Sequence, residues 1–235
     1  YGLSEKRLGN FFKNKKRDKI IVSTKVGRYL IPEDPKNINR GIFKGGLNFK
    51  PIVDYSYDGV MRSFEQSLVR LNLSYIDFCL IHDVDYFTHK NKFEFYFKQS
   101  LTGAYKALQK LKDQKLIKCV GLGLNDADVA NKFLETEDFD LVLLAGRYTL
   151  LDSSAKNNFL ETAENKKTDV IMAGVFNSGV LAKGVNRSTY FYKSIPKNIK
   201  SKYLKIKKLT DEYSVPIQAA AIQFPLKKDI VKCVV

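Results

Sequence analysis

The sequence lacks the long apolar runs typical of membrane-spanning proteins and the cysteine spacing typical of metal-binding proteins. No apolar run approaches the roughly 18 residues that suggest a membrane span, and no signal-peptide pattern opens the chain. The three cysteines, Cys79, Cys119 and Cys233, show no CxxC or histidine-rich spacing, which argues against a disulfide framework or a zinc site. We therefore expect a cytoplasmic protein with no membrane partner and no metal, in which all three cysteines are core thiols.

Acidic residues are too few to balance the basic ones. The chain has 40 Lys and Arg against 25 Asp and Glu, a formal net charge of +15. Such an excess is typical either of nucleic-acid or phosphate binding or of a solvated surface. The lysines are dispersed over segments such as 13–19 and 197–208, and no recognisable nucleic-acid-binding module surrounds them. We interpret the charge as solvated surface and expect no nucleic-acid partner.

The sequence does contain a regular alternation of helical and strand patterns. From Asp58 onward, apolar residues recur on one helical face, and the next apolar run, Tyr75–Ile81, is of β type and ends at His82. Further strands are predicted at 19–24, 118–122, 141–144, 170–173 and 230–235, all separated by helices. Six strands in this order predict a single α/β domain with a parallel sheet or barrel.

Two segments without a helical or strand pattern are predicted to be loops. Residues 26–57 are rich in proline and glycine and follow directly after the first strand. Structureless loops of this length are uncommon in compact domains and usually functional, so this one is a candidate substrate lid. Residues 83–99, which are rich in aromatic side chains, are predicted to form a second loop.

Polar residues follow four of the predicted strands: Lys25, His82, Asn125 and the turn at 177–179. A barrel would bring them together at one mouth, where the chemistry of such folds takes place. Taken singly, a lysine after a strand is usually a surface residue and an asparagine after glycine is usually part of a turn. Their joint placement favours a site, although periodicity alone does not name a reaction.

Three segments of the chain resemble motifs of the aldo-keto reductase family. They are YGLSEKRLG at 1–9, IIVSTKVG at 20–27 and SLVRLNLSYIDFCLIHDVD at 67–85, and they occur in the family's order and at compatible separations. The later segments GLGLND, LLAGRYTLLD and GVFNSGVLA are most similar to the family's sugar and pyridoxal dehydrogenase branch, which includes L-fucose, D-threo-aldose and pyridoxal 4-dehydrogenases.

The resemblance implies a (β/α)8 TIM barrel and a catalytic tetrad of Asp, Tyr, Lys and His. Tyr1 falls on the tyrosine, Lys25 on the lysine and His82 on the histidine. The aspartate would lie a few residues upstream of Tyr1. The resemblance therefore implies that residues 1–235 are a single aldo-keto reductase barrel domain truncated at both ends, with about six of eight strands.

The same resemblance implies NAD or NADP as the cofactor. Asn125 falls on the asparagine that binds the nicotinamide carboxamide, although Leu124 replaces the polar residue that commonly precedes it. Ala145 takes the place of the usual glutamine beside the nicotinamide. The family's pyrophosphate loop, which binds through backbone N–H groups, falls on Phe176, Asn177, Ser178, Gly179 and Leu181. Arg147 and Tyr148 are expected either to line the sugar pocket or to pack at the barrel rim.

The implied reaction is hydride transfer between nicotinamide and a small aldose or a related hydroxy or carbonyl compound. Proton transfer at the same oxygen suits a tyrosine, and a nearby lysine ammonium favours its phenolate form. The alternative is a cofactor-binding regulatory module of the same fold with little turnover. The sequence leaves open the choice between NAD and NADP, the exact sugar or aldehyde substrate and the oligomeric state.

Overall fold

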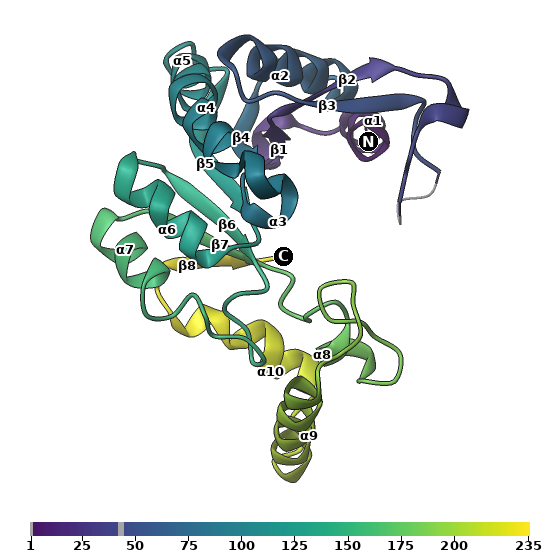
Figure 1. The fold of residues 1–235 in the computed structure, drawn as a ribbon, viewed down its shortest axis with the longest axis vertical. Coiled ribbons are helices and arrows are strands. Elements are labelled where there is room, and N and C mark those ends of the chain that lie inside the picture. Colours follow the sequence, from purple (N-terminus) through teal and green to yellow (C-terminus); the bar gives the residue numbers. More distant parts are fainter. Residues whose placement is uncertain (1, 42–44) are drawn as a thin grey trace. The chain divides into compact units, whose positions relative to one another are not determined.

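The computed structural model describes residues 2–41 and 45–235, and the chain divides into two compact units, residues 1–122 and 123–235. Each unit contains strands covered by helices, and the two are presented in turn (Figure 1). Strand β5 (Ile117–Leu124) spans the boundary, so its last two residues belong to the second unit.

The first unit is built on strands β1 (Ser23–Val26), β4 (Ile76–His82) and β5, which are hydrogen-bonded neighbours in the order β1-β4-β5. Strands β1 and β4 run parallel, with Lys25 opposite Leu80 and Val26 opposite Ile81. Val26, Leu80 and Ile81 are buried, so apolar burial determines this register. The carboxyl ends of β1 and β4 therefore lie next to each other.

The helices of the first unit confirm the amphipathic pattern after residue 57. Helix α2 (Tyr57–Leu71) begins after Ser56, whose hydroxyl accepts a hydrogen bond from the Gly59 N–H at 3.1 Å, and it buries Val60 and Phe64. The other helices are α1 (Leu3–Phe12), α3 (Tyr86–His89), α4 (Phe93–Gln99) and α5 (Lys106–Asp113), the last preceded by a π-helical segment, Ser100–Tyr105. Short 3₁₀ turns occupy Arg17–Lys19, Pro35–Asn37 and Lys90–Lys92.

The predicted loop over 26–57 is wrong, because this segment contains the antiparallel strands β2 (Arg28–Pro32) and β3 (Phe49–Val53). Gln66 of α2 stabilises the ribbon: its side-chain amide accepts from the Leu30 N–H and donates to the Leu30 carbonyl, both at 2.8 Å. Residues 42–44 of the predicted lid lie outside the described residues. The loop predicted over 83–99 is also wrong, since α3 and α4 occupy most of it.

The second unit has the strands β6 (Leu141–Ala145), β7 (Asp169–Ala173) and β8 (Val231–Val234), which are parallel neighbours in this order. All three agree with the predicted strands to within two residues. The helices are α6 (Ala127–Thr136), α7 (Phe159–Lys166), α8 (Val180–Lys183), α9 (Lys197–Glu212) and α10 (Ile217–Gln223), and a 3₁₀ turn at Pro225–Lys227 precedes β8. Helices α8, α9 and α10 pack on a common apolar cluster that includes Val180, Leu181, Tyr203 and Ala221.

The three cysteines differ in environment. Cys79 is fully buried in β4, as expected, but Cys119 is only half-buried and Cys233 is exposed on β8. The prediction of three core thiols is therefore wrong for Cys233, because nothing in the described chain covers its side chain. No helix among the described residues is long and apolar enough to cross a bilayer.

Candidate active site and cofactor site

Lys25 and His82 lie at the carboxyl ends of the paired strands β1 and β4. Because Lys25 is opposite Leu80 and side chains two residues apart share a face, Lys25 and His82 project from the same face of the sheet. Both residues line one cavity of about 250 Å³, together with Gly2, Glu5 and other residues of α1, β1 and α2. Tyr1 itself lies outside the described residues. The structure thus brings together two of the three expected catalytic residues.

His82 is paired with the acidic residue that directly follows it. Its Nε2 lies 3.0 Å from Oδ2 of Asp83, and a terminal nitrogen of Arg28 lies 3.4 Å from the same oxygen. Burial lowers the pKa of His82 below its ordinary value, against the hydrogen bond and charge of Asp83, which raise it. The imidazole is therefore neutral near pH 7, with its Nε2–H donated to Asp83.

Asp83 is in turn held as a carboxylate. Burial raises its pKa, but the hydrogen bond from His82 and the positive charges around it lower the pKa by more, to below its ordinary value. Its backbone is left-handed, with φ of 49°. Any other acceptor of the Nε2–H of His82 must therefore compete with Asp83. The sequence pattern did not identify Asp83 as the partner of His82, or Arg28 as the partner of Asp83.

A second charged cluster ties the start of the chain to the same cavity. Arg70 of α2 donates from Nε to Glu5 of α1 at 2.6 Å, and the hydroxyl of Thr24 in β1 donates to the other oxygen of Glu5 at 2.5 Å. The partly buried Glu5 carboxylate thereby joins three elements. Since Glu5 and Arg70 belong to two of the motifs on which the family resemblance rests, their pairing explains why these residue types occur together.

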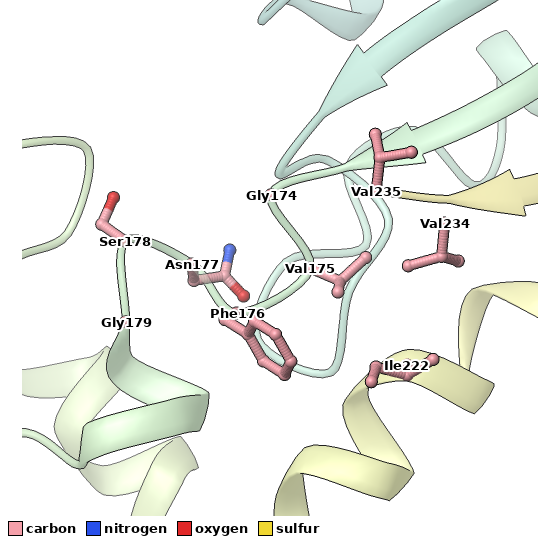
Figure 2. A pocket seen from close by; sticks show the side chains of 9 residues that line it. All are labelled: Gly174, Val175, Phe176, Asn177, Ser178, Gly179, Ile222, Val234 and Val235. Atoms are coloured by element: carbon pink, nitrogen blue, oxygen red, sulfur yellow. The ribbon is translucent and has the colours of Figure 1, made fainter. Parts of the chain in front are cut away.

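The expected cofactor loop follows β7 in the second unit. Phe176, Asn177, Ser178 and Gly179 line a cavity of about 370 Å³, together with Gly174, Val175, Ile222, Val234 and Val235. Figure 2 shows the loop on one side of this space and Ile222 of α10 and Val234 of β8 on the other. The fifth expected residue, Leu181, does not line the cavity, because its side chain is fully buried in the apolar cluster around α8.

The backbone donors expected to hold a pyrophosphate are largely engaged within the loop. The N–H of Asn177 donates to the Gly174 carbonyl at 2.9 Å, and the N–H groups of Gly179 and Leu181 both donate to the Phe176 carbonyl at 3.1 Å. These bonds hold the loop in a left-handed course, with φ of 46° at Asn177 and 98° at Gly179. A phosphate here would have to share these donors or use side chains.

Two buried side-chain groups beside the loop remain without a hydrogen-bond partner among the described residues. They are Nδ2 of Asn177 and the hydroxyl of Ser188. Asn177 is held by Thr149, whose hydroxyl donates to Oδ1 at 2.8 Å, while a side chain at Gly179 would come within 3.2 Å of the Ser188 hydroxyl oxygen. Buried polar groups normally have hydrogen-bond partners. Two unpartnered groups on either side of Gly179 therefore suit the binding of a polar or anionic ligand at this loop.

Asn125, Arg147 and Tyr148 occupy the loops after β5 and β6. The guanidinium of Arg147 donates from Nε to the Asn125 carbonyl at 2.6 Å, lies 3.3 Å from Asp152 and stacks on Phe191 with its carbon 4.3 Å from the ring centre. The Asn125 side chain is exposed. Tyr148 is buried, with its ring centre 5.1 Å from that of Phe224.

These features define a class: an α/β enzyme with a lysine and a histidine at adjacent strand ends and a glycine-containing loop suited to a phosphate-bearing cofactor. The model of the aldo/keto reductase family matches residues 1–235, and the chain belongs to this family. The predictions of an oxidoreductase and of NAD or NADP as its cofactor are confirmed.

Two relatives are similar over the whole chain. The pyridoxal 4-dehydrogenase of Microbacterium luteolum is 39% identical over 100% of this chain and 71% of its own length. The D-threo-aldose 1-dehydrogenase of a Pseudomonas species is 34% identical over 100% of this chain and 70% of its own length. Both belong to the predicted sugar and pyridoxal branch, so the resemblance of the later segments is confirmed at this level.

Solved structures support the predicted fold. A glycerol dehydrogenase from Gluconobacter oxydans matches with a TM-score of 0.70 and 22% identity, over 99% of this chain and 67% of that one. An aldo-keto reductase from Bacillus halodurans, in its holo form, matches with a TM-score of 0.68 and 21% identity over the same shares. The prediction of an α/β fold containing about six of the eight strands of a (β/α)8 barrel is confirmed.

Proposed function

We propose that this protein transfers hydride between a nicotinamide cofactor and a small aldose or a related hydroxy or carbonyl compound. The observation that carries the proposal is the placement of Lys25 and His82 on one face of adjacent strands, lining one cavity. The names of the two relatives, one acting on pyridoxal and one on D-threo-aldoses, support the substrate class.

The bound cofactor would supply the hydride acceptor or donor, and the protein's residues handle the proton and the orientation. We assign proton transfer at the substrate oxygen to Tyr1, which falls on the catalytic tyrosine of the family. The ammonium of Lys25 favours the phenolate, because a tyrosine with its ordinary pKa of about 10 is a poor base at neutral pH. His82 orients the substrate oxygen once its Nε2–H is shared with or released from Asp83.

In the second unit, we assign cofactor binding to Phe176, Asn177, Ser178 and Gly179, with Leu181 supporting the loop from the core. Asn177 and Ser188 would contribute their unpartnered polar atoms. Asn125 is proposed to contact the carboxamide. We propose that Arg147 lies at the rim of the substrate site, and that Tyr148 packs beneath Arg147. A cytoplasmic location and a single barrel domain over residues 1–235 also stay predictions.

The test uses the full-length protein with L-fucose and pyridoxal as substrates and NAD or NADP as cofactor, followed by absorbance of the reduced nicotinamide. Tyr1→Phe and His82→Gln should each lower kcat, Tyr1→Phe by roughly 10²- to 10⁴-fold because it removes the proton donor. Tyr213→Phe, which changes an exposed tyrosine, should leave kcat unchanged. Unchanged turnover in both site variants would refute the assignment, and tight cofactor binding without any turnover would favour the regulatory module.

A further inference from the structure

Tyr55 is a fully buried tyrosine that touches the ends of both strands that carry the proposed catalytic residues. Its hydroxyl donates to the carbonyl oxygen of His82 at 2.6 Å. Its ring covers Gly27, two residues after Lys25, so closely that a side-chain carbon at Gly27 would lie 2.2 Å from the ring. The side chain of Tyr55 thus contacts His82, the last residue of β4, and Gly27, the residue directly after β1.

Backbone hydrogen bonds also hold Tyr55 in place. Its N–H donates to the side-chain oxygen of Gln99 in α4 at 3.1 Å, and the N–H of the preceding Asp54 donates to the Gly27 carbonyl at 2.9 Å. Gly27 has φ of 100°, in the region that favours glycine. Only glycine combines this backbone with space for the ring, so positions 27 and 55 are matched to each other.

The hydrogen bonding of the Tyr55 hydroxyl is directed at His82. A hydroxyl has one proton to donate, and the His82 carbonyl at 2.6 Å is nearer than the Asp83 carbonyl at 3.5 Å. His89 also lies within reach, with Nε2 3.0 Å from the hydroxyl oxygen. Burial raises the pKa of Tyr55 far above its ordinary value, so the hydroxyl keeps its proton at physiological pH.

We propose that Tyr55 is a positioning residue that sets the spacing between Lys25 and His82, through its ring on Gly27 and its hydroxyl on the His82 carbonyl. The inference rests on the catalytic roles proposed above for Lys25 and His82. It goes beyond them because Tyr55 acts on the backbone at the two strand ends, through the His82 carbonyl and Gly27. A displacement of about 1 Å at a reacting group can cost roughly 100-fold in rate.

The test is Tyr55→Phe in the full-length protein, which removes the hydroxyl and keeps the ring on Gly27. Tyr75→Phe is the matched control, because Tyr75 lies just before the opposite end of the same strand and is partly buried. We expect Tyr55→Phe to lower kcat by roughly 10- to 100-fold with the KM for cofactor changed by less than about twofold. The control should keep wild-type kcat.

A second readout is independent of turnover. The chain has only two histidines, His82 and His89, so ¹⁵N-histidine NMR follows each one separately. We expect Tyr55→Phe to shift the ring nitrogen signals of His82 and to move its titration midpoint, whereas Tyr75→Phe leaves both in place. A general loss of stability would lower the melting temperature without moving the His82 signals of the folded protein.

The outcomes separate this inference from the proposed function. If the wild-type protein turns over neither L-fucose nor pyridoxal, the proposed function fails, while the NMR comparison still tests Tyr55. Unchanged His82 signals in Tyr55→Phe overturn the inference, whatever kcat does, because the residue would then not act through His82. Should Tyr55→Phe not fold, a crystal structure of the wild-type protein decides: a hydroxyl more than 3.5 Å from the His82 carbonyl refutes the proposal.

Discussion

Replacing Asp83 by Asn tests whether this carboxylate controls the charge state of His82. The change keeps the size of the side chain and an oxygen that can accept the Nε2–H of neutral His82, but it removes the negative charge. In the wild type that charge lies 3.0 Å from Nε2 and partly offsets the burial that lowers the pKa of His82. We therefore expect His82 in Asp83→Asn to be harder to protonate than in the wild type.

The size of the effect follows from the geometry. Two unit charges about 4 Å apart interact by about 4 kcal/mol near a protein surface and about 1 kcal/mol in water. The side chains of His82 and Asp83 are 27% and 19% exposed, and Arg28, 3.4 Å from the same carboxylate oxygen, neutralises part of its charge. We take the lower part of that range, about 1.4 kcal/mol, which is a tenfold loss in proton affinity.

The assay is a ¹⁵N-histidine NMR titration of both proteins, followed at the ring nitrogens of His82. Stability gives a second measure. A histidine whose pKa is lowered by folding contributes stability above its ordinary pKa of 6.5, and this is lost as the pH falls toward the folded-state pKa. Since that pKa is lower still in Asp83→Asn, urea unfolding should show a loss of stability that continues to lower pH in the variant than in the wild type.

Two results would contradict this reasoning. A His82 midpoint that stays the same in Asp83→Asn would show that the carboxylate does not interact with the protonated ring. A midpoint that rises would mean that loss of the carboxylate favours the protonated ring, which is the opposite of the expected effect, since the remaining charges of Arg28 and Lys25 also lower the pKa of His82. Asp138→Asn is the matched control, because this carboxylate is 90% exposed and pairs with Lys166 elsewhere.

Two further substitutions test the supporting structure. Asp77→Ala should lower the free energy of unfolding by about 3–5 kcal/mol, because this buried carboxylate accepts from the Val22 N–H at 2.8 Å and from Arg17 at 2.7 Å. The folded-state pKa of Asp77 is lowered, since the hydrogen bonds from Lys118, the Val22 N–H and Arg17 together outweigh the effect of burial. The deficit in urea unfolding should therefore shrink as the pH falls below 3.8, and a deficit independent of pH would refute this. Gly179→Ala should weaken NADP or NAD binding in calorimetry, because φ is 98° and the new carbon would lie 3.2 Å from the Ser188 hydroxyl oxygen. Gly41→Ala, also at positive φ but with open space around it, is the control, and equal affinity in the two variants would contradict the role of the loop.

Local sequence patterns predicted most of the regular elements. The amphipathic repeat after residue 57 and the apolar runs that became β4, β6 and β7 depend on residues near one another in the chain, so their periodicity is visible without a structure. The placement of Lys25 and His82 at strand ends followed from the same patterns, and the family motifs assigned their roles. The first strand was predicted four residues too early, since the 3₁₀ turn at Arg17–Lys19 lies where its start was expected.

Contacts between distant residues could not be predicted in this way. The ribbon of β2 and β3 was missed because it depends on pairing across a segment rich in proline and glycine, and on the Gln66 side chain from α2. Helix α4 was missed because its aromatic residues resemble a loop or strand until tertiary packing decides between them.

The sequence by itself determined the family, the order of most strands and helices, and the identity of Lys25 and His82, two of the residues that line the proposed catalytic cavity. Only the tertiary structure decided how those residues are held. Asp83 and Arg28 are 55 positions apart, and Tyr55 is 27 positions from the carbonyl that it contacts. Periodicity reports which face of an element is buried, whereas hydrogen bonds and charge pairs across such separations depend on the packed arrangement of the elements.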